Sequence, residues 1–434
     1  MQLKNILLND FLATKKIFSS LHSRNYRNYF VGQGVSLIGT WMQNIALSWL
    51  VYRITGSVFL LGLIGFTSQI PTFFLSPFLG VITDRYNKLK LLTLTQVSYM
   101  ILALVMTLLV MLNLIQVWHI IVLSVLSGVI TSLDSPARQS LVIYLVDDPA
   151  DLGNAIALNS AIFNGARLIG PAIAGLTIAA VGEGICFLLN TLSFVAVLIA
   201  ISRIKITFSH RESERDDFRK SFSEGLRYTF SSIPIRTLII ILAILSTIGM
   251  PFIVLLPAYA KEILGGSSDT LGYLMSGMGA GALTGALYMA SRKSVLGLTR
   301  IIATHLTVMG LALTLVAFSS SFWISIIIFF FGGLSMIMSL SSINTMLQTL
   351  ADDDKRGRVM SFYAMALMGT APIGNLIAGS VASAIGIRYT MLLCGVIVVL
   401  AGLWFGIIRK RLRKHIRPIY ITKGILPSIP DDLS

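Results

Sequence analysis

Long apolar runs separated by short polar segments make up most of this sequence. About 20 apolar residues cross the hydrocarbon core of a bilayer as a helix, and twelve runs are long enough to do so. They lie at residues 29–52, 57–83, 91–112, 118–140, 154–181, 184–203, 236–259, 270–291, 299–318, 322–347, 357–384 and 389–408. The sequence therefore predicts an all-α integral membrane protein with twelve transmembrane helices.

One polar stretch is much longer than the others and divides the chain near its middle. Residues 204–235 are rich in charged residues and predict a cytoplasmic linker with helical stretches. The linker separates an N-terminal six-helix half, residues 29–203, from a C-terminal six-helix half, residues 236–408. Residues 1–28 interleave basic and apolar residues and predict an amphipathic helix on the cytoplasmic surface. Residues 409–434 predict a loosely ordered cytoplasmic tail.

The basic residues are divided unevenly between the two sides of the predicted membrane. With the N-terminus inside, three of the 34 Lys and Arg fall on outer loops: Arg53, Lys261 and Arg388. One more, Arg167, lies within a span, and the remaining 30 face the cytoplasm. This asymmetry follows the positive-inside rule and predicts a multi-pass protein with both termini in the cytoplasm.

Composition agrees with a membrane protein and changes how the net charge is interpreted. Hydrophobic residues make up 55% and charged residues 12% of the chain, whereas soluble domains carry about 25% charged residues. A net charge of +15 would suggest a nucleic-acid partner in a soluble protein. Here basic loops beside an anionic leaflet explain it, so we expect membrane lipid and not nucleic acid as the partner.

The sequence argues against an enzyme, a channel and a pump driven by ATP. Its five histidines are scattered, both cysteines lie inside apolar runs, and no HExxH or Gly-x-Ser-x-Gly motif occurs. A channel would need rings of charge or a carbonyl filter. No Walker A motif occurs, so ATP is not the direct source of energy. We therefore expect neither a cofactor nor a metal, and an energy source other than ATP.

The fifth and eleventh spans are related by an internal repeat. A shift of 204 positions aligns residues 165–182 with the later span at eight identities in eighteen positions. Aligned glycines include Gly170 with Gly374 and Gly175 with Gly379. Two six-helix halves in the same orientation are the sign of parallel repeats, so we expect two pseudo-symmetric halves. Arg167 and Pro171 have no equivalent in the second half, which makes them better candidates for function.

The loop after the second predicted span carries a charged motif. Gly80 and Asp84 lie four residues apart and share a helix face, and Arg85 and Lys88 follow them. This arrangement resembles the loop signature of the major facilitator superfamily, with Asn87 in place of that family's usual glycine. The resemblance implies the major facilitator fold, with Asp84 as a gate element that meets the N-terminal end of the eleventh helix. An ordinary positive-inside loop is the alternative.

Polar residues inside the first, fourth and fifth spans are candidates for a substrate and proton pathway. Such residues avoid lipid, so they either bond neighbouring helices together or line a cavity. A charge at the depth of Arg167 is costly and usually functional. Arg167 is predicted to contact an anionic group of the substrate or to pair with Asp134, whose protonation would couple proton entry to export. A structural pair of Asp134 with Arg138 is the alternative. The candidate residues are Gln33, Gln43, Asn44, Asp134, Arg138, Asn159, Asn164 and Arg167.

The fifth span also resembles the helix motif associated with antiporters of the superfamily. Gly170, Pro171 and Gly175 match it, whereas Ala174 replaces one glycine. A bendable, closely packed helix follows from such residues. A kinked packing helix without bearing on transport direction is the alternative.

Stretches in the first, fourth and fifth spans narrow the resemblance to a bacterial subgroup. They run from Gly32 to Asn44, from Asp134 to Gln139 and from Leu158 to Pro171. They resemble the subgroup that includes the enterobactin exporter and related drug and macrolide effluxers. The resemblance implies a proton-coupled exporter of small amphiphilic molecules, such as drugs or a siderophore, working by alternating access. It also implies the bacterial cytoplasmic membrane, and we expect a monomer. Uptake symport and lipid flipping are the alternatives.

Overall fold

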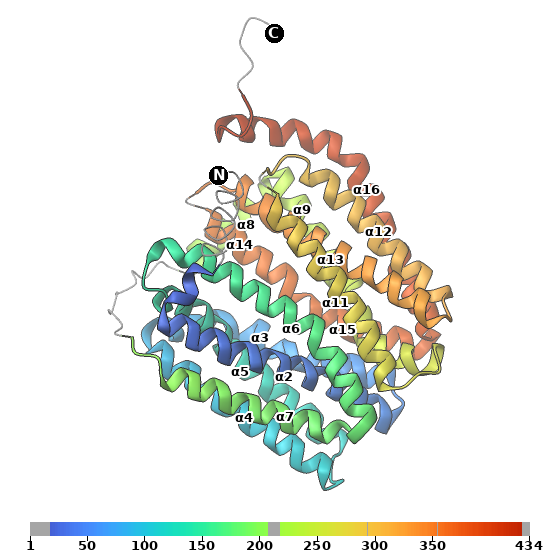
Figure 1. Cartoon of the computed structure of the whole chain (residues 1–434). Coiled ribbons are helices and arrows are strands. Elements are labelled where there is room, and N and C mark those ends of the chain that lie inside the picture. The colour runs from blue at the N-terminus through green and yellow to red at the C-terminus, as the bar shows by residue number, and fades with distance from the viewer. Residues whose placement is uncertain (1–17, 207–217, 293, 354, 428–434) are drawn as a thin grey trace, which may run out of the picture. The chain divides into compact units, whose positions relative to one another are not determined.

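A computed structural model describes residues 18–206, 218–292, 294–353 and 355–427, and every regular element in them is helical (Figure 1). The first part of the chain forms η1 (Ser19–His22), α2 (Arg24–Thr55), α3 (Val58–Arg85), α4 (Lys88–Met111), α5 (Val117–Leu145), η2 (Pro149–Asp151), α6 (Leu152–Val181) and α7 (Glu183–Ser202). The second part forms α8 (Phe218–Ser231), α9 (Ile233–Ile244), η3 (Leu245–Gly249), α10 (Phe252–Ala258), η4 (Tyr259–Ile263), α11 (Ser268–Ser291), α12 (Leu298–Phe318), α13 (Phe322–Leu350), α14 (Arg356–Ala364), η5 (Met365–Gly369), α15 (Ala371–Ile385) and α16 (Ile387–Thr422).

Twelve helical segments coincide with the twelve predicted spans. Ten segments of the described chain are long and apolar enough to cross a membrane. The first and eighth predicted spans are the remaining two, and they form α2 and α11. Both helices are continuous, and the polar residues of α2 and the small residues of α11 lower their mean hydropathy. The prediction of an all-α membrane protein is confirmed.

The helices group into two compact units. Each unit includes one short segment from the other part of the sequence. Unit 1 contains residues 18–54, 67–206 and 266–276 of the described chain, and unit 2 contains residues 55–66, 218–265 and 277–427. The beginning of α3 therefore belongs to unit 2, and the beginning of α11 belongs to unit 1. The predicted division into two halves at the linker stays a prediction.

Repeat-related glycines make equivalent close contacts in the two units. In unit 1, a Cβ built on Gly175 of α6 would lie 3.0 Å from the Cα of Gly272 in α11. In unit 2, a Cβ built on Gly379 of α15 would lie 2.8 Å from the Cα of Gly62 in α3. Helix backbones can approach this closely where glycine lacks a side chain. Because Gly175 and Gly379 are aligned by the repeat, these contacts agree with parallel repeats.

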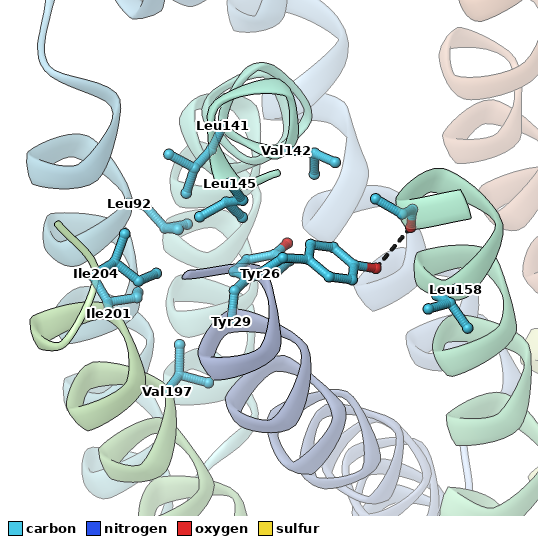
Figure 2. Close-up of a cluster of buried hydrophobic side chains, with 11 residues drawn as sticks. Tyr26, Tyr29, Leu92, Leu141, Val142, Leu145, Leu158, Val197, Ile201 and Ile204 are labelled. Carbon is cyan, nitrogen blue, oxygen red and sulfur yellow. Dashed lines mark hydrogen bonds between the residues drawn. The ribbon is translucent and has the colours of Figure 1, made fainter. Parts of the chain in front are cut away.

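A buried cluster joins the beginnings and ends of several helices in unit 1. Figure 2 shows Tyr26 and Tyr29 of α2 among apolar side chains of α4, α5, α6 and α7. The hydroxyl of Tyr26 donates to the carbonyl oxygen of Ala155 at 2.8 Å. These contacts extend α2 back to Arg24, so residues 24–28 are not part of a separate surface helix as predicted. The predicted helix at residues 1–17 lies outside the described chain.

Two spans of unit 2 are interrupted by π-helical turns. The seventh span contains η3 and η4, and the eleventh contains η5 between α14 and α15. The hydroxyl of Ser246 in η3 donates to the carbonyl oxygen of Leu367 in η5 at 2.5 Å. A wide π-turn displaces backbone carbonyls from the α-helical ladder, and this hydroxyl supplies one with a donor. The interruptions η3 and η5 are therefore in direct contact.

The last helix is longer than predicted. The final span was expected to end at residue 408 before a loosely ordered tail, but α16 continues to Thr422. Leu412, Ile416 and Tyr420 recur every four residues and are 3%, 5% and 6% exposed. This apolar stripe packs the end of α16 against the protein and explains why the helix persists beyond the membrane-spanning part. The prediction of a loosely ordered tail is wrong for residues 409–422.

Candidate functional site

The charged side chain of Arg167 lies over an aromatic ring of α2. Its Cζ atom is 5.7 Å from the ring centroid of Trp41. The Trp41 ring meets Phe163 edge to face at 6.0 Å. A cation over an indole face is a favourable contact worth about 0.5–2 kcal/mol. The result is a cationic and aromatic site, here called the Arg167 site, made by Arg167, Trp41 and Phe163.

Close packing of the two helices brings Trp41 to Arg167. A Cβ built on Gly170 would lie 2.6 Å from the Cβ of Trp41, so the glycine makes room for the indole. Pro171 follows inside α6, which continues through it to Val181. Gly170 and Gly175 therefore lie at close helix contacts, which both the antiporter-like motif and its packing alternative predict. Whether the motif also sets transport direction stays a prediction.

Arg167 has no carboxylate partner among the described residues. Its Nε atom is buried and makes no hydrogen bond within the described chain. The predicted pair between Arg167 and Asp134 is therefore absent from this structure. A buried N–H without an acceptor is costly, because water is lost and nothing replaces it. An acceptor carried by a ligand would satisfy this donor.

Asp134 instead lies in a hydrogen-bonded cluster between α4 and α5, in which both of its carboxylate oxygens have donors, whereas Oε1 of Gln96 and Nη1 of Arg138 have no partner in the described chain. Its Oδ1 atom accepts from the hydroxyl of Thr95 at 2.7 Å and from the amide of Gln96 at 2.8 Å. Its Oδ2 atom accepts from Nε and Nη2 of Arg138 at 3.1 and 2.7 Å. The structural pair of Asp134 with Arg138 is thus present. Tyr29 of the buried cluster lies beside this pair.

The polar residues of α2 fall into two groups. Gln43 accepts a hydrogen bond from the amide of Asn190 in α7 at 2.7 Å and links the two helices. Gln33 is 6% exposed, and its Oε1 atom is buried without a donor in the described chain. Asn44 is exposed and lies three residues after Trp41, on the same helix face. The α2 series therefore supplies both helix-to-helix bonds and a polar edge beside the Arg167 site.

The two asparagines of α6 also differ in their contacts. Asn164 lies one turn before Arg167, and its amide donates to the carbonyl oxygen of Ser160 at 2.8 Å. Asn159 accepts from the hydroxyl of Tyr26 at 3.4 Å. Asn164 therefore shares a face with Arg167, whereas Asn159 takes part in the packing around Tyr26.

The loop motif is described in part. Gly80, Asp84 and Arg85 lie in the last turns of α3, and their side chains fall outside the described part of the chain. Asn87 accepts from the backbone N–H groups of Leu89 and Lys90 at 3.0 and 3.1 Å and caps α4. An N-cap is a common role for asparagine, which explains the departure from the family's usual glycine.

Lys88, the last residue of the predicted motif, contacts α5. Its Nζ atom lies 5.6 Å from the ring centroid of Tyr144. The contact places the basic end of the motif beside the C-terminal part of α5. The gate role predicted for Asp84 stays a prediction.

Sequence reasoning missed the aromatic partner of Arg167, Trp41, and the cap at Asn87. An asparagine immediately before an apolar run is a recognisable signal for a cap. No comparable signal links Trp41 to Arg167, because they lie on different helices and meet through packing alone.

Comparison with known proteins places this fold in a family of transporters. The sequence model of the transmembrane secretion effector family matches residues 15–417. The staphyloferrin A transporter of Staphylococcus aureus (strain NCTC 8325 / PS 47) is 26% identical over 395 residues, covering 89% of this chain and 96% of that protein. The multidrug efflux pump Tap of Mycolicibacterium fortuitum is 23% identical over 397 residues, covering 88% of this chain and 93% of that protein.

A solved structure supports the fold independently. The bacterial homologue of the iron transporter ferroportin, in its inward-facing state, superimposes with a TM-score of 0.69 at 19% identity. The match covers 88% of this chain and 98% of that one. At this identity the likeness shows the fold alone. The expected resemblance to a subgroup of siderophore transporters and drug efflux proteins is confirmed by these relatives.

Proposed function

Because this chain belongs to the transmembrane secretion effector family of major facilitator transporters, we propose that it is a proton-coupled exporter of small amphiphilic anions. The relatives include a transporter for a siderophore, staphyloferrin A, and a multidrug efflux pump. We place the protein in the bacterial cytoplasmic membrane with both termini in the cytoplasm, which the distribution of Lys and Arg supports.

The Arg167 site carries this proposal. Arg167 is a half-buried cation whose buried Nε–H has no acceptor in the described chain. Such a group favours a ligand that brings a carboxylate or another anionic oxygen. The rings of Trp41 and Phe163 beside it favour a ligand with an apolar or flat part. A substrate with both features, such as a carboxylate siderophore or an acidic drug, would match the site.

Asp134 has two candidate roles, and its contacts favour the structural one. Each carboxylate oxygen already accepts two hydrogen bonds. A proton arriving on either oxygen would displace a donor and weaken the pair with Arg138. We therefore propose that Asp134 holds α4 and α5 together, and that proton coupling does not pass through it.

Alternating access needs helix contacts that can separate and re-form. The glycine contacts at Gly175 with Gly272 and at Gly379 with Gly62 bring backbones together without interlocking side chains. Contacts of this kind can part at little cost, because few apolar atoms interlock across them. We assign them to the surfaces that open and close during transport.

Substrate binding can be tested through the tryptophan of the site. We expect an anionic substrate to change the fluorescence of the purified protein, and the change to disappear in Trp41→Phe. Arg167→Gln should weaken binding at least about tenfold, since a hydrogen bond to a charged group contributes about 1.5–3 kcal/mol. Arg300→Gln, which removes an exposed arginine from α12, serves as the matched control.

Each outcome of this titration bears on the proposal. Unchanged affinity in Arg167→Gln would contradict the Arg167 site while leaving the protein a transporter. Binding of phospholipids to the Arg167 site, with no binding of soluble anions, would instead favour lipid flipping.

A further inference from the structure

An open polar cavity of about 380 Å³ lies in unit 2, where α13 ends, α14 begins and α16 ends. The cavity is lined by Thr345, Gln348, Thr349, Arg356, Lys423 and Ile425. Two of these side chains are cations, two carry hydroxyl groups and one carries an amide. No carboxylate is among the six, although Arg356 pairs with Asp353 outside the lining. The remaining N–H groups of Arg356, the ammonium group of Lys423, the two hydroxyl groups and the amide are donors that suit an anion.

Both cations of the cavity keep hydrogen-bond donors for a further acceptor. The Nζ atom of Lys423 donates to the carbonyl oxygen of Ala351 at 2.6 Å, and an ammonium group has three N–H donors. Arg356 donates from Nε to the carbonyl oxygen of Gln348 at 3.1 Å and from Nη2 to Asp353. A guanidinium group has five donors, so part of its capacity remains.

The helix that delivers Lys423 to the cavity is strongly basic. Between residues 409 and 417, α16 carries six Lys and Arg in nine positions. Arg413, Lys414 and Arg417 are exposed, whereas the opposite stripe at Leu412, Ile416 and Tyr420 is buried. Figure 1 shows this last, red part of α16 turning away from the direction of the rest of the helix. Basic clusters immediately beyond a membrane span attract anionic lipid headgroups.

We propose that this cavity binds the phosphate group of an acidic phospholipid, with Arg356 and Lys423 as its cations. The assignment to the cytoplasmic leaflet rests on the proposed orientation, in which the C-terminus is cytoplasmic. A phosphate group presents several acceptor oxygens, which can bind the remaining donors of the lysine and the arginine that line the cavity. The exposed basic residues of α16 raise the local concentration of such lipids beside the cavity.

Lipid binding at this place would stabilise the start of α14. The connection between α13 and α14 is held by α16 through the carbonyl of Ala351, and by α8 through Tyr228, whose hydroxyl accepts from the N–H of Asp352 at 3.1 Å. Glu224 of α8 also pairs with Arg358 of α14 at 2.7 Å. A phosphate bound by Lys423 and Arg356 would join the contacts that fix this connection. Thermal stability of the protein therefore reports on binding.

The experiment compares thermal unfolding of the purified full chain with and without phosphatidylglycerol in the detergent micelle. Phosphatidylglycerol should raise the unfolding temperature of the wild type, and phosphatidylcholine should not. The rise should be lost in Lys423→Gln and retained in Lys414→Gln, which removes an exposed lysine of the same helix. Each variant is compared with itself, so a lower starting stability of Lys423→Gln does not affect the result.

Other results would overturn the proposal. An equal rise in both lysine variants would show attraction between a basic surface and anionic lipid, without a site. A rise with inorganic phosphate that phosphatidylglycerol fails to produce would identify a site for soluble phosphate. No rise with either probe would show that the cavity binds no phosphate. None of these readouts involves transport, so failure of the export proposal would leave the lipid site standing.

Discussion

Arg167 combines a charge that lacks an acidic partner in the described chain with an aromatic neighbour. Replacing it with lysine keeps the charge but removes the planar group that lies over Trp41. We expect Arg167→Lys to bind an anionic substrate more weakly than the wild type and more tightly than Arg167→Gln, because arginine and lysine differ at stacked sites. Titration of the three proteins with one substrate measures this order. Equal loss in both variants would indicate that stacking, and not charge, dominates.

Asp134 illustrates a charge whose partners are all supplied by the protein. Replacing it with asparagine leaves Arg138 partly buried without a carboxylate, and breaking a buried pair costs about 3–5 kcal/mol. Because Asp134 and Arg138 retain 10% and 24% side-chain exposure, we expect a loss at or below the lower end of this range. Thermal unfolding of purified Asp134→Asn measures it, and Asp134→Asn combined with Arg138→Gln should recover part of the stability.

A different result would support a role for Asp134 in proton coupling. If Asp134→Asn unfolds at the wild-type temperature but no longer moves protons with substrate, Asp134 carries the coupling and the structural role is wrong.

Helix α6 meets α11 where both backbones carry glycine. A methyl group on Gly175 would lie 2.8 Å from the carbonyl oxygen of Ser268, so the helices would have to separate. We expect Gly175→Ala to lower the transport rate. Gly165→Ala is the matched control on the same helix, since nothing lies within 4 Å of the added carbon. Transport in everted vesicles at equal protein levels compares them. Equal transport rates in both variants would show that the contact between Gly175 and α11 has no role in transport.

Two of the three π-helical interruptions of the described chain, η3 and η5, are joined by one hydroxyl group. Ser246→Ala leaves the carbonyl oxygen of Leu367 without this donor, and we expect a loss of about 0.5–1.5 kcal/mol in stability. Ser380→Ala on α15 is the control, because that hydroxyl bonds the carbonyl oxygen of Leu376 in its own helix. Urea or thermal unfolding measures both. No loss in Ser246→Ala beyond that in Ser380→Ala would show that the bond between η3 and η5 is unimportant for stability.

The helices could be predicted from the sequence because spanning a bilayer requires long apolar runs, whatever the contacts between them. Two helix boundaries were predicted wrongly, the start of α2 and the end of α16, because both depend on tertiary packing. Tyr26 extends α2 by entering a buried cluster, and Leu412, Ile416 and Tyr420 extend α16 by packing against the protein. The spacing of these last three residues is a helical signal that the sequence did contain.

The charged residues of the candidate site could be predicted from the sequence, but their interaction partners could not. Arg167 and Asp134 were identified because charges within spans are rare and costly. Their separation, with Asp134 bound to Arg138 and Arg167 bound to Trp41, depends on how α2, α4, α5 and α6 pack. A single sequence shows which residues share a face of one helix. It does not show which other helices pack against that face.

As a whole, the molecule is a major facilitator transporter with a cationic aromatic site in one unit and a basic cavity in the other. Export driven by protons is tested most directly in proteoliposomes with a pH gradient, by recording proton movement when carboxylate siderophores or acidic drugs are added. We expect a proton signal opposite in direction to substrate movement, lost in Arg167→Ala and retained in Arg300→Gln. Protons and substrate moving in the same direction, or a signal that survives in Arg167→Ala, would contradict export through the Arg167 site.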